Sequence, residues 1–258
     1  AAASTLLVCN RDDERVMARV GRFPGRTVTF GTAEGADVRA VDVEERGVRG
    51  THARLVTPAG ERVVEVPLLG MGNLSNVLAA TATALSLGVA FDAIVGCVAT
   101  LAAAPRRGTV RRLTDGIVLI DDSYNANPES MRAGVDALAS IGQDAAVRRT
   151  VAVLGVMREL GAESAGFHAA LAGPIAAAKV DYAILVGEEM AALAKALGGG
   201  PELAHVPDAA AALDLAREAI GPGDAVLVKG SNSIGLAALV EALAGGSSGL
   251  VDPERPLQ

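Results

Sequence analysis

The chain has 258 residues, half of them hydrophobic, which suits one large or two ordinary globular domains and argues against disorder. Its formal net charge of -7 argues against a nucleic-acid-binding surface, which needs clustered Lys or Arg. The two cysteines, Cys9 and Cys97, lie in unrelated apolar segments, so the sequence predicts neither a metal site nor a disulfide framework. A reducing cytoplasm is the compartment that fits this cysteine usage best.

Short β-type runs separated by Gly and Pro make up the first part of the chain, and they are predicted at residues 5–9, 26–30, 37–43, 51–57 and 62–68. The last three alternate polar and apolar residues, which predicts an antiparallel patch attached to a sheet. Helical spacing predicts helices over 12–20, 76–87 and 91–102.

The apolar stretch 77–104 resembles a membrane span in composition. Gly88 and Asp92 interrupt it, whereas a spanning helix needs about 20 nearly uninterrupted apolar residues. We therefore expect core helices here and no membrane insertion.

From residue 109 onward strands and helices alternate. Nearly continuous apolar runs, typical of strands buried on both faces of a parallel sheet, occur at 117–120, 150–154, 182–186 and 225–228. Helices are predicted after them at 128–140, 163–178, 188–197 with 209–219, and 235–244. The fold class is therefore α/β, with a Rossmann-like second domain and a mainly parallel sheet. We place the domains at 1–108 and 109–246, followed by a loose tail at 247–258.

The densest polar cluster is Asp-Asp-Ser-Tyr-Asn-Ala-Asn-Pro at 121–128, directly after a predicted strand. Ligands bind at the carboxyl ends of strands in open α/β sheets, and these side chains offer partners for ribose hydroxyls, ammonium groups and carboxylates. The alternative is an elaborate helix cap and turn, in which Asn127 is the N-cap and Pro128 the first helical residue. Asp121 and Asp122 would point to opposite faces of a continuing strand, so they do not form an obvious acid–base pair.

Three further turns are candidates. Lys229, Gly230 and Ser231 follow an apolar strand and precede a helix, an arrangement that can hold an anion although it is no Walker A loop. The loop 155–161, which contains Glu159, follows another strand and is equally compatible with an ordinary exposed loop. The turn 70–76 leads into a helix, where capping is the default role for its asparagines. We expect structural or surface roles for the histidines, which are His52, His168 and His205.

Taken together, the segments DDSYNANPESM, VAVLG, ELG and VLVKGS resemble the Mur ligases, in particular the branch that adds D-alanyl-D-alanine. CNRDD at 9–13 and GNLSNVLAATATAL at 72–85 are similar to segments late in that family's central ATPase domain. The resemblance therefore implies the C-terminal part of an incomplete α/β central ATPase domain followed by the family's C-terminal domain.

The implied reaction is ATP-dependent amide bond formation through an acyl phosphate, which joins D-alanyl-D-alanine to UDP-N-acetylmuramoyl-tripeptide in peptidoglycan precursor synthesis. ATP and Mg2+ are the implied cofactors. The resemblance places Asn73 and Asn76 near the adenine, Arg107 near the nucleotide and Asp122 on the ribose. It implies a substrate-binding role for Ser123, Tyr124, Asn125, Asn127, Glu159, Lys229 and Ser231.

The sequence departs from the family pattern at three positions. Gly72 replaces a usual His, Val156 replaces a usual acidic residue, and Pro-Arg-Arg at 105–107 replaces the commoner Pro-Gly-Arg. No GxxxxGK[ST] loop occurs, and in the family this loop, the magnesium ligands and the carbamate-bearing lysine precede the matched segments. We assign no catalytic residue here and expect the polypeptide alone to be inactive.

Two alternatives stay open. One is a non-catalytic fragment or degenerate relative that binds a nucleotide or a peptide. The other is a ligase of the same kind with a different substrate, which the departures at Gly72 and Val156 allow.

Overall fold

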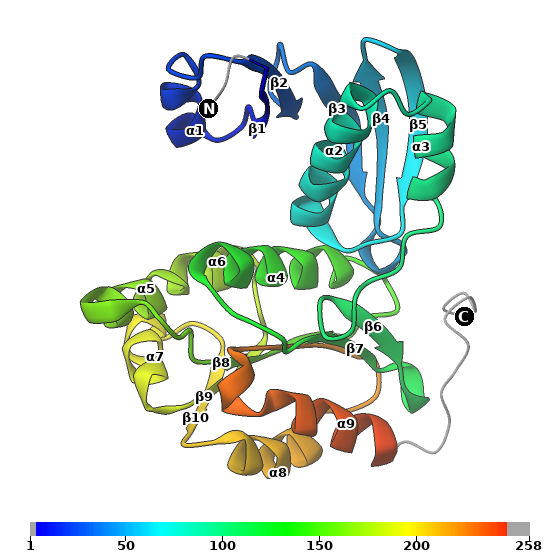
Figure 1. Ribbon diagram of the computed structural model, residues 1–258. Helices are drawn as coiled ribbons and strands as arrows, with labels where there is room; N and C mark the ends of the chain where they lie inside the picture. The colour runs from blue at the N-terminus through cyan, green and yellow to red at the C-terminus, as the bar shows by residue number, and fades with distance from the viewer. Residues whose placement is uncertain (1–3, 247–258) are drawn as a thin grey trace. The chain divides into compact units, whose positions relative to one another are not determined.

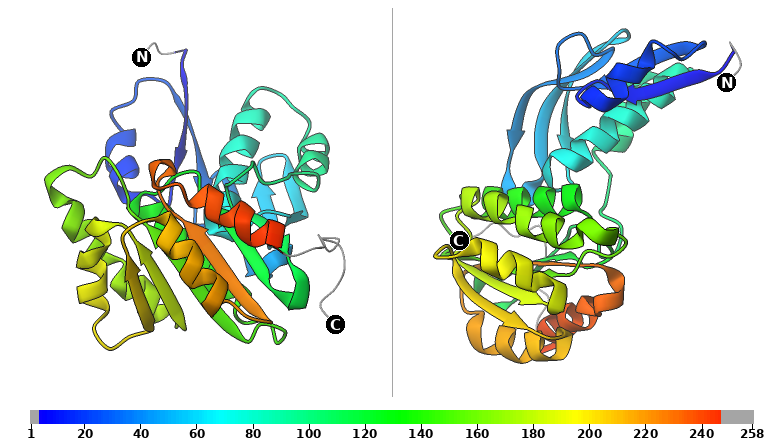
Figure 2. Two further views of the ribbon diagram at one scale, coloured as in Figure 1. Left: turned by 90° about the horizontal axis from the view of Figure 1, so that it is seen from below. Right: turned by 90° about the vertical axis from the view of Figure 1, so that its left-hand side faces the viewer.

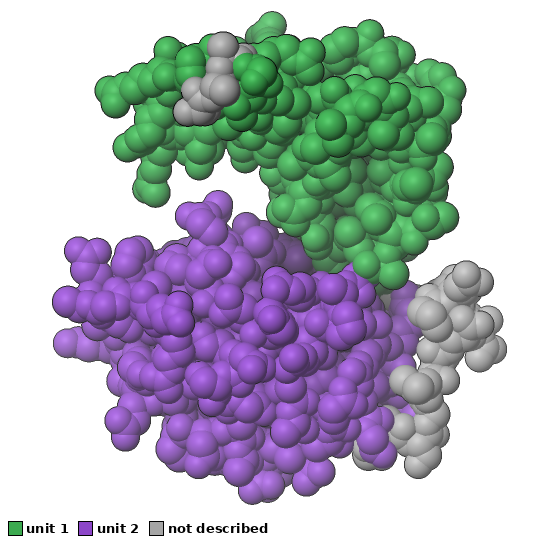
Figure 3. Space-filling model, viewed as in Figure 1, with its two compact units in different colours: residues 1–102 green, residues 103–258 purple. Residues whose placement is uncertain are grey.

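The structure is a computed structural model that describes residues 4–246. The chain divides into two compact units, Ala1–Ala102 and Ala103–Gln258, which Figure 3 colours separately. The predicted tail at 247–258 lies outside the described residues.

The first unit contains, among its described residues, a sheet of order β1-β2-β3-β4-β5. Its strands are β1 (Leu6–Asn10), β2 (Arg26–Gly31), β3 (Val38–Glu45), β4 (Thr51–Thr57) and β5 (Gly60–Val66). The first three pair in parallel, whereas β3, β4 and β5 pair antiparallel. The alternating pattern of the sequence therefore predicted the antiparallel patch correctly.

The helices of this unit are α1 (Glu14–Val20), α2 (Gly70–Ser86) and α3 (Phe91–Val98). The predicted start of α2 at residue 76 is wrong, because the helix begins at Gly70. Its buried face has helical spacing, and the tertiary contacts of that face hold the glycine-rich first turns in the helix despite their low propensity. This face consists of Leu74, Val77, Leu78, Thr81 and Ala82. The helix contacts β1 to β4, and α3 contacts β5, so both cover the sheet.

The second unit contains a sheet of order β10-β9-β8-β11-β7-β6 in its described part. The strands are β6 (Thr109–Arg112), β7 (Val118–Asp122), β8 (Arg149–Gly155), β9 (Tyr182–Val186), β10 (Glu202–Val206) and β11 (Asp224–Lys229). β6 pairs antiparallel with β7, and the other described pairs are parallel. The α/β class and the mainly parallel sheet are confirmed.

Helices cover both faces of this sheet (Figures 1 and 2), with α4 and α6 on one face and α8 and α9 on the other. The helices are α4 (Pro128–Ile141), α5 (Ser164–Ala170), α6 (Ala172–Ala177), α7 (Ala191–Leu197), α8 (Ala209–Ala219) and α9 (Leu236–Gly246). The core between these layers comes from aliphatic strand residues such as Val151, Val153, Ile184, Val226 and Val228, which are fully buried.

The strands β6 and β10 were missed from the sequence. Both lie at the edges of the sheet, where only one side of a strand is paired. β6 reads Thr-Val-Arg-Arg and β10 reads Glu-Leu-Ala-His-Val, so neither has the continuous apolar run by which the central strands were recognised. Among the described residues, no helix has both the length and the apolar character needed to cross a bilayer.

Candidate functional site

The carboxyl ends of three neighbouring strands, β7, β8 and β11, lie at the same end of the second sheet. β11 lies between β7 and β8, with Lys229 in register with Asp122 on one side and Leu154 on the other. The chain continues from β8 to α5, which packs with α6 on the face of α4, and from β11 to α9, which packs with α8 on the opposite face. Helices after adjacent strands thus diverge, and such a switch point is where open α/β sheets bind ligands.

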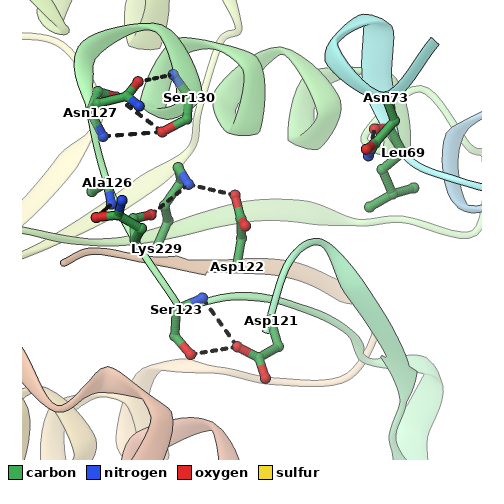
Figure 4. Close-up of polar contacts among 10 residues, drawn as sticks. Leu69, Asn73, Asp121, Asp122, Ser123, Ala126, Asn127, Ser130 and Lys229 are labelled. Atoms are coloured by element: carbon green, nitrogen blue, oxygen red, sulfur yellow. Dashed lines mark hydrogen bonds and ion pairs between the residues drawn. The ribbon is translucent and has the colours of Figure 1, made fainter. Parts of the chain in front are cut away.

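Lys229 and Asp122, the last residues of β11 and β7, form an ion pair. The Nζ of Lys229 donates to Asp122 Oδ2 at 2.6 Å and to the carbonyl of Asn125 at 3.0 Å (Figure 4). The lysine side chain is only 2% exposed, whereas that of Asp122 is 23% exposed. Burial raises the pKa of Asp122, and the nearby ammonium offsets part of that effect. Lys229 therefore holds the turn after β7 in place while Asp122 keeps contact with solvent.

Asp121 points away from Asp122, as predicted for successive strand residues (Figure 4). It is buried, and it accepts hydrogen bonds from the hydroxyl and the backbone N–H of Ser123 at 2.6 and 3.2 Å. Its carboxylate also lies 3.8 Å from the Arg111 guanidinium. Ser123 is buried as well, so the structure gives its hydroxyl an internal partner, and its role in substrate binding stays a prediction.

The remaining carboxamides of the cluster have different surroundings. Asn127 is the N-cap of α4, accepting from the Ser130 N–H at 2.8 Å, while the Ser130 hydroxyl accepts from the Asn127 N–H at 3.1 Å. The predicted N-cap is confirmed. Asn125 is exposed, and its Oδ1 accepts from the N–H of Ala126 at 2.8 Å. Its amide NH2 can thus donate to a ligand.

The turns after β8 and β11 pack against each other. The N–H of Ser231 donates to the Val156 carbonyl at 3.1 Å, and its hydroxyl accepts from the Arg158 N–H at 3.0 Å. The backbones come so close that a Cβ on Gly230 would lie 3.0 Å from the Cα of Gly155, which is why both strand ends have glycine. Ser231 is buried in this contact.

After the buried Met157, the loop continues through the exposed residues Arg158 and Glu159. Arg158 forms an ion pair with Glu189. Glu159 is exposed and has a left-handed backbone with φ of 64°. The turn with Ser231 therefore fixes one end of this loop, and Glu159 extends from it into solvent.

The buried His168 supports the same loop. Its Nε2 accepts from the Met157 N–H at 2.9 Å, and its Nδ1 lies 2.7 Å from the Ser164 carbonyl, to which it can only donate. By joining Met157 to Ser164, His168 has the structural role that we expected from the sequence. His52 lies beside Glu65 at 2.7 Å, and His205 contacts the Gly187 carbonyl at 2.8 Å.

Arg107 and Tyr124 stack at the start of β6. The guanidinium carbon of Arg107 lies 4.2 Å from the Tyr124 ring centroid, and that of Arg106 lies 5.2 Å from it. Tyr124 is 41% exposed. The structure thus brings Arg107 next to the 121–128 turn. Arg106 was not a candidate from the sequence, because the left-handed backbone that distinguishes it appears only in three dimensions.

Asn73 and Asn76 lie in the first unit, on α2. Neither caps the helix: Asn73 Nδ2 donates to the Leu69 carbonyl at 2.8 Å within the first turns, and Asn76 is exposed two turns into the helix. The default expectation of capping is therefore wrong, because α2 starts earlier than predicted. Because they are three residues apart, the two asparagines are neighbours on the surface of the helix.

Across residues 4–246, no three or more His, Cys, Asp and Glu side chains are arranged to hold a metal ion. The second unit does offer a carboxylate fixed by an ammonium, an exposed carboxamide and an exposed guanidinium close together in the fold. Such a set can bind a polar, hydroxyl-bearing or zwitterionic small molecule. By fold, this unit is a doubly wound α/β domain with a mainly parallel sheet.

Comparison with known proteins assigns both units. Residues 2–84 match the Mur ligase middle domain, and residues 106–232 match the Mur ligase glutamate ligase domain. The UDP-N-acetylmuramoyl-tripeptide–D-alanyl-D-alanine ligase of Mycobacterium tuberculosis (strain CDC 1551 / Oshkosh) is 35% identical over 262 residues, which cover 93% of this chain and 51% of that ligase. The chain thus spans about half the length of the curated relatives it matches, and it belongs to the Mur ligase family.

Solved structures agree with this family assignment. A crystal structure of MurF from Acinetobacter baumannii superposes with a TM-score of 0.81 and 29% identity, covering 95% of this chain and 52% of that one. MurF from Thermotoga maritima, solved in complex with ADP, superposes with a TM-score of 0.79 and 24% identity over 95% of this chain and 54% of its own. At that identity the second likeness concerns the fold.

Proposed function

We propose that these residues are part of a MurF-type ligase, which uses ATP to join D-alanyl-D-alanine to UDP-N-acetylmuramoyl-tripeptide. The relative from M. tuberculosis that matches 93% of this chain carries that name. The observation that carries the proposal is the fixed pair Lys229 and Asp122 at the switch point of the second sheet. It orients a solvent-accessible carboxylate where ligands of such sheets bind.

The nucleotide side of the proposal rests on four residues. Asp122 would accept from the ribose hydroxyls, and Arg107 would approach the nucleotide with its exposed guanidinium. Asn73 and Asn76 would contact the adenine, for which Asn76 has an exposed carboxamide. ATP would supply the phosphoryl group that converts the tripeptide carboxylate into a reactive acyl phosphate, and Mg2+ would neutralise phosphate charge.

The residues proposed for dipeptide binding form two groups. One group can contact the ligand, and the other holds the first group in position. Tyr124, Asn125, Asn127 and Glu159 are exposed and would contact D-alanyl-D-alanine. Ser123, Lys229 and Ser231 are buried and would act by fixing the turns from which the exposed side chains project. The chemistry needed here is positioning of the incoming amine, which fixed turns provide.

We assign residues 1–108 to the C-terminal portion of the central ATP-binding domain and residues 109–246 to the C-terminal domain. The family match at 2–84 lies within the first of these parts, and the match at 106–232 begins three residues before the second. The reaction would take place in the cytoplasm, a reducing compartment in which the free thiols of Cys9 and Cys97 persist.

Calorimetric titration of the purified chain tests the function. We expect heat of binding with ATP and with D-alanyl-D-alanine, and much less with L-alanyl-L-alanine. Asp122→Asn should weaken ATP binding about tenfold, corresponding to about 1.4 kcal/mol for a lost charged hydrogen bond. Asp136→Asn, which changes an exposed carboxylate on α4, is the matched control and should leave both affinities unchanged.

Different outcomes separate the candidate functions. Binding of ATP together with a different dipeptide would indicate a ligase with another substrate. Absence of heat with every ligand, at concentrations up to the millimolar range, would overturn the proposal.

A further inference from the structure

Arg106 occupies a backbone position that normally requires glycine. The Arg107 N–H donates to the Ala104 carbonyl at 3.0 Å, which closes a four-residue turn with Pro105 and Arg106 at its centre. The φ of Arg106 is 61°. A turn with Pro at its second position and a left-handed residue at its third is the arrangement in which glycine is strongly preferred. The chain thus keeps a long cationic side chain where the backbone disfavours one.

The contacts of Arg106 join three segments of the second unit. Its carbonyl accepts from the Tyr124 N–H at 3.1 Å, in the turn after β7. Its guanidinium donates to Asn232 Oδ1 at 2.8 Å, in η5 (Asn232–Ile234) after β11. The same guanidinium lies over the Tyr124 ring, which also carries Arg107.

Besides the strained backbone of Arg106, the arrangement has an unfavourable electrostatic interaction. Arg106 and Arg107 bring two positive charges to one aromatic ring, and these charges repel each other. Residues with a strained backbone cluster at active sites and ligand clamps, where the surrounding structure holds them. Here the hydrogen bond to Asn232 and the interaction with the ring hold the strained residue in place.

We propose that Arg106 is a positioning residue, which holds the Tyr124 ring and the Arg107 guanidinium stacked so that Arg107 is presented to the bound nucleotide. Its backbone carbonyl fixes Tyr124, and its side chain anchors the 104–107 turn to Asn232. The role of Arg107 in contacting a nucleotide rests on the proposed ligase function. The clamp itself, meaning the contacts of Arg106 with Tyr124 and Asn232, is defined by the contacts given above.

Three substitutions separate the side chain from the backbone strain. Arg106→Gly removes the side chain and relieves the left-handed strain, so the variant should fold. Arg106→Ala removes the side chain and keeps the strain. Arg106→Lys keeps a cation that can reach Asn232 but lacks the planar guanidinium. A purely structural role predicts that the glycine variant behaves like the wild type, whereas the positioning role predicts that only lysine restores the clamp.

The first readout needs no ligand. Protons of the Arg107 side chain that lie over an aromatic ring resonate upfield in the proton NMR spectrum. We expect this upfield shift to fall by at least half in the glycine and alanine variants and to be largely retained with lysine. Arg132→Ala, which removes a 59% exposed arginine that pairs with Glu129 on α4, is the matched control. An Arg107 shift that is unchanged in Arg106→Gly would overturn the inference.

The second readout is ATP affinity by calorimetry. Arg106→Gly should lose about threefold to tenfold in affinity, as expected for one charged hydrogen bond and one cation–π contact acting indirectly. Wild-type-like affinity in this variant would contradict the positioning role and leave the ligase proposal intact. If the wild-type chain binds no nucleotide, the ligase proposal fails, and the NMR shift still decides whether Arg106 holds the stack.

Discussion

Lys229 and Asp122 are in register on the parallel strands β11 and β7, and the lysine Nζ donates to Asp122 Oδ2 at 2.6 Å. Because the ammonium also donates to the Asn125 carbonyl, one buried side chain fixes both the end of β7 and the turn that follows it. The candidate ligand-binding residues of that turn depend on this contact for their position.

Replacing Lys229 by methionine should destabilise the second unit strongly. The substitution leaves a partly buried carboxylate without its cation, and loss of one partner of such a pair costs about 3 kcal/mol. Urea unfolding measures this free energy. Lys195→Met, at an exposed lysine on α7, should cost little, about 0.5 kcal/mol or less. A cost for Lys229→Met as small as that of Lys195→Met would show that the pair contributes nothing to stability.

Asp122 should make stability depend on pH. Because burial raises its pKa in the folded state, the unfolded state releases the proton first as pH rises. The contribution of Asp122 is therefore fully present below the ordinary carboxyl pKa of about 3.9 and is lost as pH rises through the raised folded value. The free energy of unfolding of Asp122→Asn, measured with urea relative to that of wild type, should therefore increase as pH rises from 4 to 7. A relative loss over this range would mean that Lys229 outweighs burial.

Gly134→Ala tests how tightly Lys229 is held. A Cβ at this position of α4 would lie 3.0 Å from the Lys229 Cδ and 3.4 Å from Leu227 Cδ2. The lysine is buried and its Nζ is held by two hydrogen bonds, which restrain it from moving away. We expect a net loss of about 1 kcal/mol, since overpacking exceeds the gain in helix propensity.

Gly166→Ala is the control for this substitution. Apart from its chain neighbours and the nearby backbone of α5, no atom lies within 4 Å of the added Cβ, so stability should rise by about 0.5 kcal/mol. Equal stabilisation of both variants, measured by thermal unfolding, would contradict the tight packing around Lys229.

His168 should be neutral with its proton on Nδ1. The Ser164 carbonyl requires a donor at Nδ1, and the Met157 N–H requires an acceptor at Nε2. Nitrogen-15 chemical shifts of the imidazole distinguish this tautomer directly. His168→Phe should cost about 2 kcal/mol, because it leaves the buried Met157 N–H without an acceptor. Observation of the Nε2–H tautomer would contradict the hydrogen bonds described for the loop after β8.

The sequence predicted the central strands because their apolar runs are continuous, and it predicted the Asn127 cap because capping chemistry is local. It also located the three strand ends at which polar residues gather. The burial of Lys229 was not predictable, because it depends on the register between β11 and β7, which are about a hundred residues apart in sequence. Arg106 was missed although the departure from Pro-Gly-Arg at 105–107 was noted, because that departure does not by itself show that the arginine keeps a left-handed backbone. The start of α2 was predicted too late because tertiary packing outweighs the low helix propensity of Gly70 and Gly72.

The central claim is that the turn after β7, held by Lys229, is a ligand-contact surface. Amide NMR titration of the chain with D-alanyl-D-alanine tests it most directly. We predict shifts concentrated at residues 123–127 together with the adjoining turns 156–159 and 230–232. Shifts confined to the opposite ends of the strands, for example at residues 221–223, or no shifts at millimolar dipeptide, would contradict the account.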